Sequence, residues 1–184
     1  ILAQTLASTA SIINSTLELD QVLDAIMASI ELVIAYDTCN IMLIKDGVAQ
    51  IVRGRGFEDY GIEADIIGLR FTIKDTPNLR DMAATREPYL IGDTRTHPEW
   101  IVIELVEWVA SYLGVPIEID DEVIGILNMD SAEAHAFTQA DTRIIQAFAD
   151  QAAIAIRNAR LYHATRRRQQ YLATLRRVSR RSVP

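Results

Sequence analysis

The sequence has few of the features that define several other classes of protein. Its 184 residues include one cysteine, Cys39, which excludes an intrachain disulfide and a cysteine-rich zinc site. Eight glycines and five prolines are too few for a collagen-like or low-complexity chain. No apolar run reaches the ~18 residues that span a bilayer. With 49% apolar and 23% charged residues, the composition is that of a globular protein with a sizeable core. Because the chain does not begin with methionine, we expect it to be part of a longer protein.

Charge is distributed unevenly along the chain. Residues 1–142 hold 8 Lys+Arg against 24 Asp+Glu, a balance of −16, whereas residues 143–184 hold 10 arginines against Asp150 alone, a balance of +9. The acidic part argues against nucleic acid or an anionic membrane as a partner. We interpret the basic end as the solvated face of a long helix, with a nucleic-acid or lipid-binding arm as the lesser alternative.

Helical patterns are predicted at both ends of the chain. Residues 1–14 carry a narrow apolar stripe typical of a helix–helix seam. A second helix of about 16 residues is predicted to begin at a capping Asp20. The last helix is predicted to begin at Thr138 and to meet no glycine or proline before Pro184, so it runs for ~60–70 Å. Its far end must project from the domain, where we expect it to pair with another copy.

The middle of the chain reads as two hairpins separated by shorter elements. Turns at Asp46-Gly47 and at Asp120-Asp121 join the expected strands 39–44 with 48–53 and 111–119 with 122–130. The segments between them predict strands 71–73 and 89–91, a helix 78–86, a polar loop 92–99 and helical spacing over 100–108. This order predicts an α+β fold, with an antiparallel sheet backed by helices 20–35 and 138–162 on one face.

Three sequence segments resemble the second half of a GAF domain: SYLGVPI at 111–117, VIGILNMD at 123–130 and AFT at 136–138. The run from 144 to 162 is similar to the closing helix of that family, and LDQVL at 19–23 is similar to its opening helix. The resemblance implies a GAF-like (profilin/PAS-like) antiparallel sheet with a helical bundle on one face and a ligand pocket on the other. It divides the chain into an N-terminal signalling and dimerisation helix (1–16), a GAF domain (17–162) and a projecting linker helix (163–184).

The resemblance also implies a function. GAF domains bind cyclic nucleotides, bilins, haem or small metabolites, or serve only as dimerising relays. Residues 171–181 resemble the linker before the dimerisation helix of bacterial sensor histidine kinases. The chain is therefore predicted to be a cytoplasmic signal-input domain of a bacterial signalling protein, above all a histidine kinase. A ligand-free relay and a haem- or chromophore-based sensor, with His97 as the candidate ligand, remain alternatives. An enzyme is disfavoured because this fragment contains no phosphate-binding loop and no nucleophile–base motif.

Candidate pocket residues follow from strand alternation and from the resemblance. Alternation puts Asn40, Met42 and Ile44 on one face of their strand, and Ile124, Ile126 and Asn128 on one face of theirs. Pairing of these strands as in a GAF domain brings the two asparagines together, facing either the pocket or the helical bundle. Trp100 and Trp108 either line the pocket or form the core side of a short helix. The predicted pocket residues are Asn40, Met42, Asp93, His97, Trp100, Tyr112 and Asn128.

No cofactor or metal is predicted. Cys39 begins an apolar strand, where a small buried side chain is expected. The bilin-anchoring cysteine of related GAF domains corresponds to a position near Trp100, where this chain has none, so a bilin is not expected. Its three histidines lie far apart in sequence without ligand spacing. An unidentified small-molecule effector is the expected partner.

A second expected partner is another copy of the chain. Apolar positions in both terminal helices are spaced as in a coiled-coil seam, although Arg168 interrupts it. The predicted seam consists of Leu2, Leu6, Ile13, Tyr171, Leu175 and Val178. We expect a parallel homodimer through both terminal helices, with no membrane contact by this fragment.

Overall fold

A six-stranded antiparallel sheet forms the middle layer of the computed structural model, which describes residues 19–181 and their side chains as far as residue 169. The strands follow the order β3-β2-β1-β6-β5-β4, and every neighbouring pair is antiparallel. They are β1 (Thr38–Lys45), β2 (Val48–Arg55), β3 (Arg70–Thr72), β4 (Tyr89–Ile91), β5 (Ser111–Ile119) and β6 (Glu122–Ser131).

Both predicted hairpins are confirmed. Asp46 and Gly47 have φ of 51° and 75°, and Asp120 and Asp121 have φ of 51° and 65°. Two successive left-handed residues match the twist of the flanking strands, and aspartate and glycine adopt that conformation at low cost.

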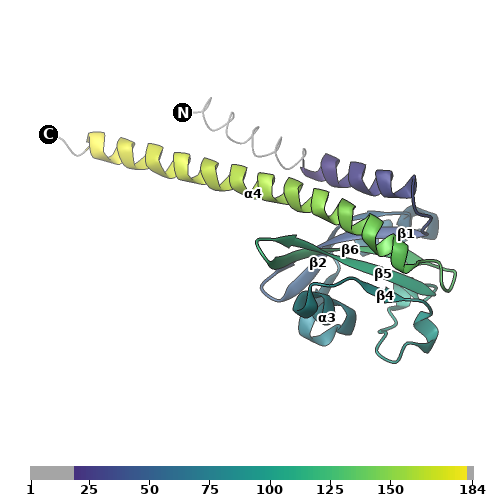
Figure 1. Cartoon of the computed structure of the whole chain (residues 1–184). Coiled ribbons are helices and arrows are strands. Elements are labelled where there is room, and N and C mark those ends of the chain that lie inside the picture. Colours follow the sequence, from purple (N-terminus) through teal and green to yellow (C-terminus); the bar gives the residue numbers. More distant parts are fainter. Residues whose placement is uncertain (1–18, 182–184) are drawn as a thin grey trace.

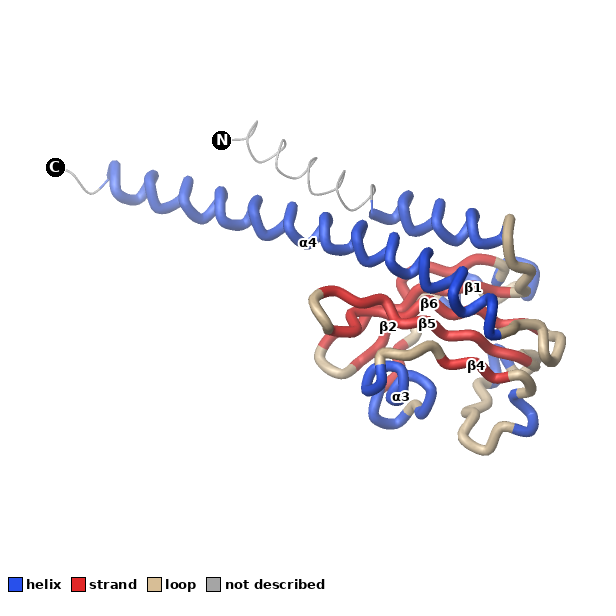
Figure 2. The backbone as a smooth tube through the Cα atoms, in the orientation of Figure 1, coloured by secondary structure: helices blue, strands red, loops and turns tan. Residues whose placement is uncertain are grey.

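Two helices cover one face of the sheet, as predicted: residues 19–31 and α4 (Gln139–Arg181) (Figures 1 and 2). Their apolar stripes meet the sheet in a buried core that contains Leu23, Met27, Ile30, Ile41, Leu127, Met129, Ile145, Ala149, Ala152 and Ile156. The small alanines allow α4 to lie close to the strands. Thr138 and Asp141 cap α4 reciprocally. The Asp141 carboxylate accepts from the Thr138 backbone N–H and hydroxyl, each at 2.7 Å, and the Thr138 hydroxyl oxygen accepts from the Asp141 backbone N–H at 3.4 Å. The 43 residues of α4 extend for about 65 Å, which confirms the long projecting helix.

The predicted cap at Asp20 is wrong. Residues 19 and 20 are already helical, and the Asp20 carboxylate instead forms an ion pair with Arg53 of β2. This ion pair ties the first helix to β2, the strand next to the edge strand β3.

Short elements cover the opposite face: α2 (Glu63–Ile66), α3 (Pro77–Thr85) and the 3₁₀ turns η1 (Phe57–Tyr60), η2 (Ile73–Asp75), η3 (Thr94–Thr96) and η4 (Glu104–Val106). The helix expected over 100–108 is absent, because only η4 is helical there. β-branched residues at 101–103 restrict χ1 in a helix and favour extended backbone. The segment instead crosses the cavity side of the sheet as an irregular loop.

The prediction from strand alternation is wrong at one position, Ile124. Ile117 pairs with Gly125 but Glu118 pairs with Val123, so Ile124 is an additional residue on β6. This bulge turns Ile124 into the helix-side core, while Ile126 and Asn128 remain on the other face. The expectation that Ile124 shares a face with Asn128 was therefore wrong.

Some predictions lie outside the described residues. The helix 1–14 with Leu2, Leu6 and Ile13 is not described, nor are the side chains of Tyr171, Leu175 and Val178. The boundaries predicted at residues 16 and 162 stay predictions. In the described part of the chain, none of the helices combines the length and apolar character needed to cross a membrane.

Candidate functional site

A partly enclosed cavity lies between the sheet and the short elements that cover it, opposite the two long helices. The volume that the centres of water molecules can occupy in it is about 110 Å³, which is enough for a small ligand. Apolar side chains form most of its wall: Met42, Ile51, Phe57, Ile66, Leu69, Phe71, Leu79, Trp100, Ile101, Ile103, Val106 and Val109. Its polar side chains are Asn40, Thr76, Asn78, Tyr112, Asn128 and Asp130. A mostly apolar cavity with a few polar groups is typical of a small-molecule site.

Strand register arranges the cavity floor in three rows. The first row contains Thr38, Asp130 and Tyr112, and the second contains Asn40, Asn128 and Gly114. The third contains Met42, Ile126 and Pro116. Successive rows are about 7 Å apart, because same-face residues alternate along a strand. Polar groups therefore gather at one end of the floor and apolar groups at the other.

A chain of hydrogen bonds joins three of these side chains. The Tyr112 hydroxyl donates to Asn128 Oδ1 at 2.5 Å, and Asn128 Nδ2 donates to Asn40 Oδ1 at 2.9 Å. All three side chains are buried, so each bond offsets the cost of removing its polar atoms from water. Burial also raises the pKa of the Tyr112 phenol, which keeps its proton available for donation.

Asp130 is the ionisable group of the cavity. Its side chain is buried, and Oδ2 accepts a hydrogen bond from the Thr38 hydroxyl at 3.1 Å. Burial raises the pKa of Asp130 to about 7, and the nearby Asp37 carboxylate acts in the same direction. The hydrogen bond from Thr38 lowers that pKa, but burial dominates.

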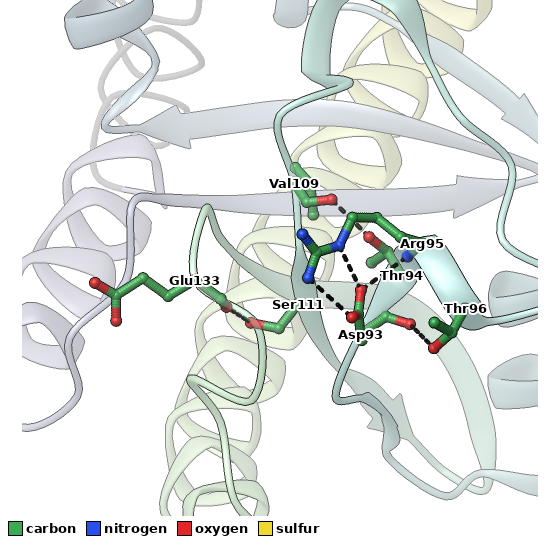
Figure 3. Close-up of polar contacts among 7 residues, drawn as sticks. All are labelled: Asp93, Thr94, Arg95, Thr96, Val109, Ser111 and Glu133. Atoms are coloured by element: carbon green, nitrogen blue, oxygen red, sulfur yellow. Dashed lines mark hydrogen bonds and ion pairs between the residues drawn. The ribbon is translucent and has the colours of Figure 1, made fainter.

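Hydrogen bonds from Thr94 join the two ends of the loop that forms one wall, and Figure 3 shows the bond to Val109. The buried Thr94 hydroxyl donates to the Val109 carbonyl at 2.6 Å, and the Thr94 N–H donates to the Ala110 carbonyl at 2.9 Å. Trp108, near the far end of the loop, stacks on Tyr60 with 4.1 Å between ring centroids. These contacts hold Trp100 and Val106 over the cavity while leaving Val102 68% exposed.

Five of the seven predicted pocket residues line this cavity: Asn40, Met42, Trp100, Tyr112 and Asn128. Trp100 packs against Tyr112 with ring centroids 5.2 Å apart. Trp108, which was expected to share a helix face with Trp100, packs outside the cavity lining.

The other two predicted residues, Asp93 and His97, lie outside the cavity lining. The Asp93 carboxylate caps η3 and accepts hydrogen bonds from the Arg95 backbone and guanidinium at 2.8–3.1 Å (Figure 3). Those hydrogen bonds from Arg95 lower the pKa of Asp93. His97 packs edge-on against Tyr89 with 5.9 Å between ring centroids. The tight η3 turn holds both residues near the edge strand β4, a placement that loop position in the sequence does not specify.

The sequence prediction missed Asp130. Alternation along its strand puts Asp130 on the same face as Asn128, so the available signal was sufficient. The predicted pocket residues stop at Asn128 and leave out Asp130, the last residue of the expected strand 122–130.

Cys39 lies on the other face of the sheet, in the core beneath the helices. It is fully buried, and burial raises the pKa of its thiol. A buried, protonated thiol is a poor nucleophile and a poor attachment point. Among the described residues, no three His, Cys, Asp or Glu side chains are grouped closely enough to hold a metal ion.

Comparisons with known proteins place this architecture in a family. The sequence matches the GAF domain over residues 18–156. The structure resembles a GAF domain/HD domain protein from Geobacter sulfurreducens, with a TM-score of 0.70 and 17% identity over 78% of this chain and 95% of that one. It also resembles the GAF domain of a two-component sensor histidine kinase from Bacillus halodurans, with a TM-score of 0.64 and 16% identity over 78% and 97% of the two chains.

A third similar structure is a type II free methionine-R-sulfoxide reductase from Thermoplasma acidophilum, with a TM-score of 0.63 and 17% identity over 78% and 95% of the two chains. The family match spans most of the sequence, and the antiparallel sheet with helices on one face and a cavity on the other agrees with it. The chain belongs to the GAF domain family of signalling and sensory domains.

Proposed function

We propose that this chain is the ligand-sensing and dimerising input domain of a bacterial signal-transduction protein, most specifically a cytoplasmic histidine kinase. The observation that carries the proposal is that one set of strands serves both the cavity and the helices. On β1, Asn40 lines the cavity while its neighbour Ile41 packs beneath the helices. On β6, Asn128 lines the cavity while its neighbour Leu127 packs beneath the helices. A shift of these strands when the cavity fills moves both layers together.

A second connection runs around the edge of the sheet. Tyr60, which stacks on Trp108 near the end of the loop that crosses the cavity, donates a hydrogen bond to Asp37 Oδ1 at 3.3 Å. The adjacent Tyr36 donates to the Met27 carbonyl in the first helix at 3.1 Å. The loop over the cavity therefore contacts the segment that enters β1 directly from the first helix.

Exposed apolar residues on α4 support dimerisation as the output. Ile154 is 53% exposed and Leu161 is 60% exposed, and the two are seven residues apart on one helix face. The same spacing continues in the sequence to Arg168 and Leu175. A repeat of seven residues is typical of a coiled-coil seam, which a second copy would bury. The likeness to a histidine kinase GAF domain and the linker-like sequence at 171–181 favour a kinase as the output.

The alternative activities have less support from the site. A sulfoxide reductase activity like that of the similar Thermoplasma protein requires accessible thiol chemistry, whereas Cys39 is fully buried away from the cavity. A haem sensor would need a histidine in the cavity, but none of the described lining residues is histidine and His97 packs against Tyr89. A relay without ligand remains the second candidate, since the Tyr112–Asn128–Asn40 chain satisfies much of the buried polar surface internally.

Cysteine cross-linking tests coupling between the cavity and α4. In a Cys39→Ala background, a Leu161→Cys variant reports the approach of two α4 helices by its rate of disulfide formation. Val106→Phe, which fills part of the cavity, is expected to change that rate at least ~3-fold. Val102→Phe lies in the same loop but is 68% exposed, and is expected to leave the rate unchanged. Equal rates in all three proteins would contradict the input function, and no ligand need be known beforehand.

A further inference from the structure

We propose that the cavity binds a small apolar amine, with the ammonium group held by the Asp130 carboxylate and the apolar body lying toward Met42. The inference rests on the proposed sensing function and adds the chemical class of the ligand. Three observations carry it: the position of Asp130 in the cavity, the distribution of charge around it, and the aromatic rings beside it.

Asp130 has bonding capacity that the described residues leave unused. Oδ2 accepts from the Thr38 hydroxyl, while Oδ1 has no hydrogen-bond donor in the described part of the structure. Asp130 also forms no ion pair with any described residue. A buried carboxylate is costly unless it is paired, so a ligand that brings a cationic donor gains affinity at this position.

Charge around the cavity disfavours an anionic ligand. None of the described residues that line the cavity is Lys, Arg or His. The nearby arginines lie on the helix side of the sheet, where Arg53 pairs with Asp20 and Arg55 with Glu31. Asp37, close to Asp130, adds a second negative charge. The field at this end of the cavity therefore attracts cations and repels phosphates and carboxylates.

Aromatic rings complete the proposed site for an ammonium group. Tyr112 lies beside Asp130 in the first row of the floor, and Trp100 packs against Tyr112 with ring centroids 5.2 Å apart. A carboxylate together with aromatic faces binds an ammonium through ionic and cation–π attraction. Beyond this polar end, the side chains of Met42, Ile51 and Phe71 offer apolar contacts to the rest of the ligand.

Three probes of similar shape separate the possible classes of ligand: 2-phenylethylamine, 2-phenylethanol and 3-phenylpropanoate. Isothermal titration calorimetry on the full chain at pH 7.5 should show binding of the amine at least ~10-fold tighter than the alcohol, and weaker binding still of the carboxylate. Quenching of Trp100 fluorescence in a Trp108→Phe variant should locate the bound amine in the cavity.

Substitution of the carboxyl group tests its role directly. Asp130→Asn keeps the side-chain shape, and should weaken amine binding at least ~10-fold while changing alcohol binding less than ~3-fold. Asp121→Asn removes an exposed hairpin carboxylate and should change neither. Thermal unfolding of each variant shows whether it is folded at the assay temperature.

A measurement on the unchanged protein keeps the proposal testable if Asp130→Asn does not fold. Ammonium binding favours the ionised carboxylate, so amine affinity should rise between pH 5 and pH 8 while alcohol affinity stays constant. The groups that face Asp130 are the Thr38 hydroxyl, the Asp37 carboxylate and the Tyr112 phenol. An Asp37→Asn variant, which removes the neighbouring carboxylate, should leave the pH trend in place.

Three outcomes would overturn the amine proposal: no amine binding at millimolar concentration, carboxylate or alcohol binding as tight as amine binding, or an amine affinity independent of pH. None of them decides the sensing function, which the cross-linking rates of the cavity-filling variant test without any probe. Loss of coupling in that assay, together with amine binding, would leave a binding site without the proposed output.

Discussion

Tyr112 reaches diagonally across the sheet to Asn128, which lies two residues away from its direct partner on β6. The register pairs Tyr112 with Asp130 and Asn128 with Gly114, yet the phenol donates to Asn128 Oδ1 at 2.5 Å. The diagonal bond is possible because Gly114 has no side chain opposite Asn128. A Cβ at Gly114 would meet the Tyr112 hydroxyl and would lie 2.7 Å from Met82 Cε.

Removing the hydroxyl should destabilise the domain. Tyr112→Phe leaves Asn128 Oδ1 buried without its donor, so we expect a loss of about 1–3 kcal/mol in the free energy of unfolding. Tyr89→Phe is the matched control, since its half-buried hydroxyl is 3.5 Å from the nearest His97 nitrogen, and should cost less than about 0.5 kcal/mol. Urea denaturation measures both. Equal losses would show that the diagonal hydrogen bond contributes little.

Gly114→Ala should be destabilising for a different reason, namely crowding. The added methyl group must displace the Tyr112 hydroxyl and the end of Met82, at a cost of about 1–3 kcal/mol. In the double variant with Tyr112→Phe, one of these two contacts disappears. The double variant should therefore be more stable than the sum of the single effects by at least about 0.5 kcal/mol. If the stability loss of the double variant equals the sum of the two single losses, the methyl group does not clash with the Tyr112 hydroxyl.

The sheet and its helices could be predicted because their signals are local and repeated. Two Asp-containing turns joined strands of clear length, and Thr138 with Asp141 identified the start of the long helix. The same reasoning brought Asn40 and Asn128 together, since alternation and strand pairing determine which residues share a row.

The errors arose where tertiary contacts override local pattern. The bulge that turns Ile124 toward the helices has no signal in the residues around it. The loop 100–108 has helical spacing, but its side chains are held by contacts to the sheet and by the Trp108–Tyr60 stack. Asp93 was predicted to line the pocket because it lies in a loop. The same loop position is equally compatible with the local ion pair that Asp93 forms with Arg95.

Stability should depend on pH through Asp130. Burial raises its folded-state pKa to about 7 from an ordinary value of 3.8. Between these two pH values the folded state keeps a proton on Asp130 that the unfolded state has lost. The contribution of this protonated carboxyl group to the free energy of unfolding is therefore fully present below about pH 4. It is lost as pH rises toward 7, by at most about 1.4 kcal/mol per pH unit.

The matched protein for this measurement is Asp130→Asn, which cannot titrate at that position. Urea denaturation of both proteins at pH 4.5, 5.5, 6.5 and 7.5 isolates Asp130 from the other carboxylates. The wild type should lose stability relative to Asp130→Asn across this series. A constant difference would mean that the folded-state pKa of Asp130 is not raised.

The last prediction concerns the dimer expected through the terminal helices. Arg166, Arg167 and Arg168 begin a run of positive charge near the projecting end of α4, and Asp150 is the nearest acidic residue on that helix after its first turn. Two parallel copies would place these like charges side by side, so salt should relieve their repulsion. We expect a parallel homodimer whose dissociation constant, measured by sedimentation velocity, decreases as NaCl is raised from ~0.05 to ~0.5 M.

Leu161→Glu should shift the chain toward monomer at both salt concentrations, because Leu161 lies on the exposed apolar repeat of α4. Leu32→Glu changes an even more exposed leucine just after the end of the first helix, and should leave association unchanged. A chain that is monomeric at both salt concentrations, or a dimer that survives deletion of residues 1–14 and 163–184, would show that the seam lies elsewhere.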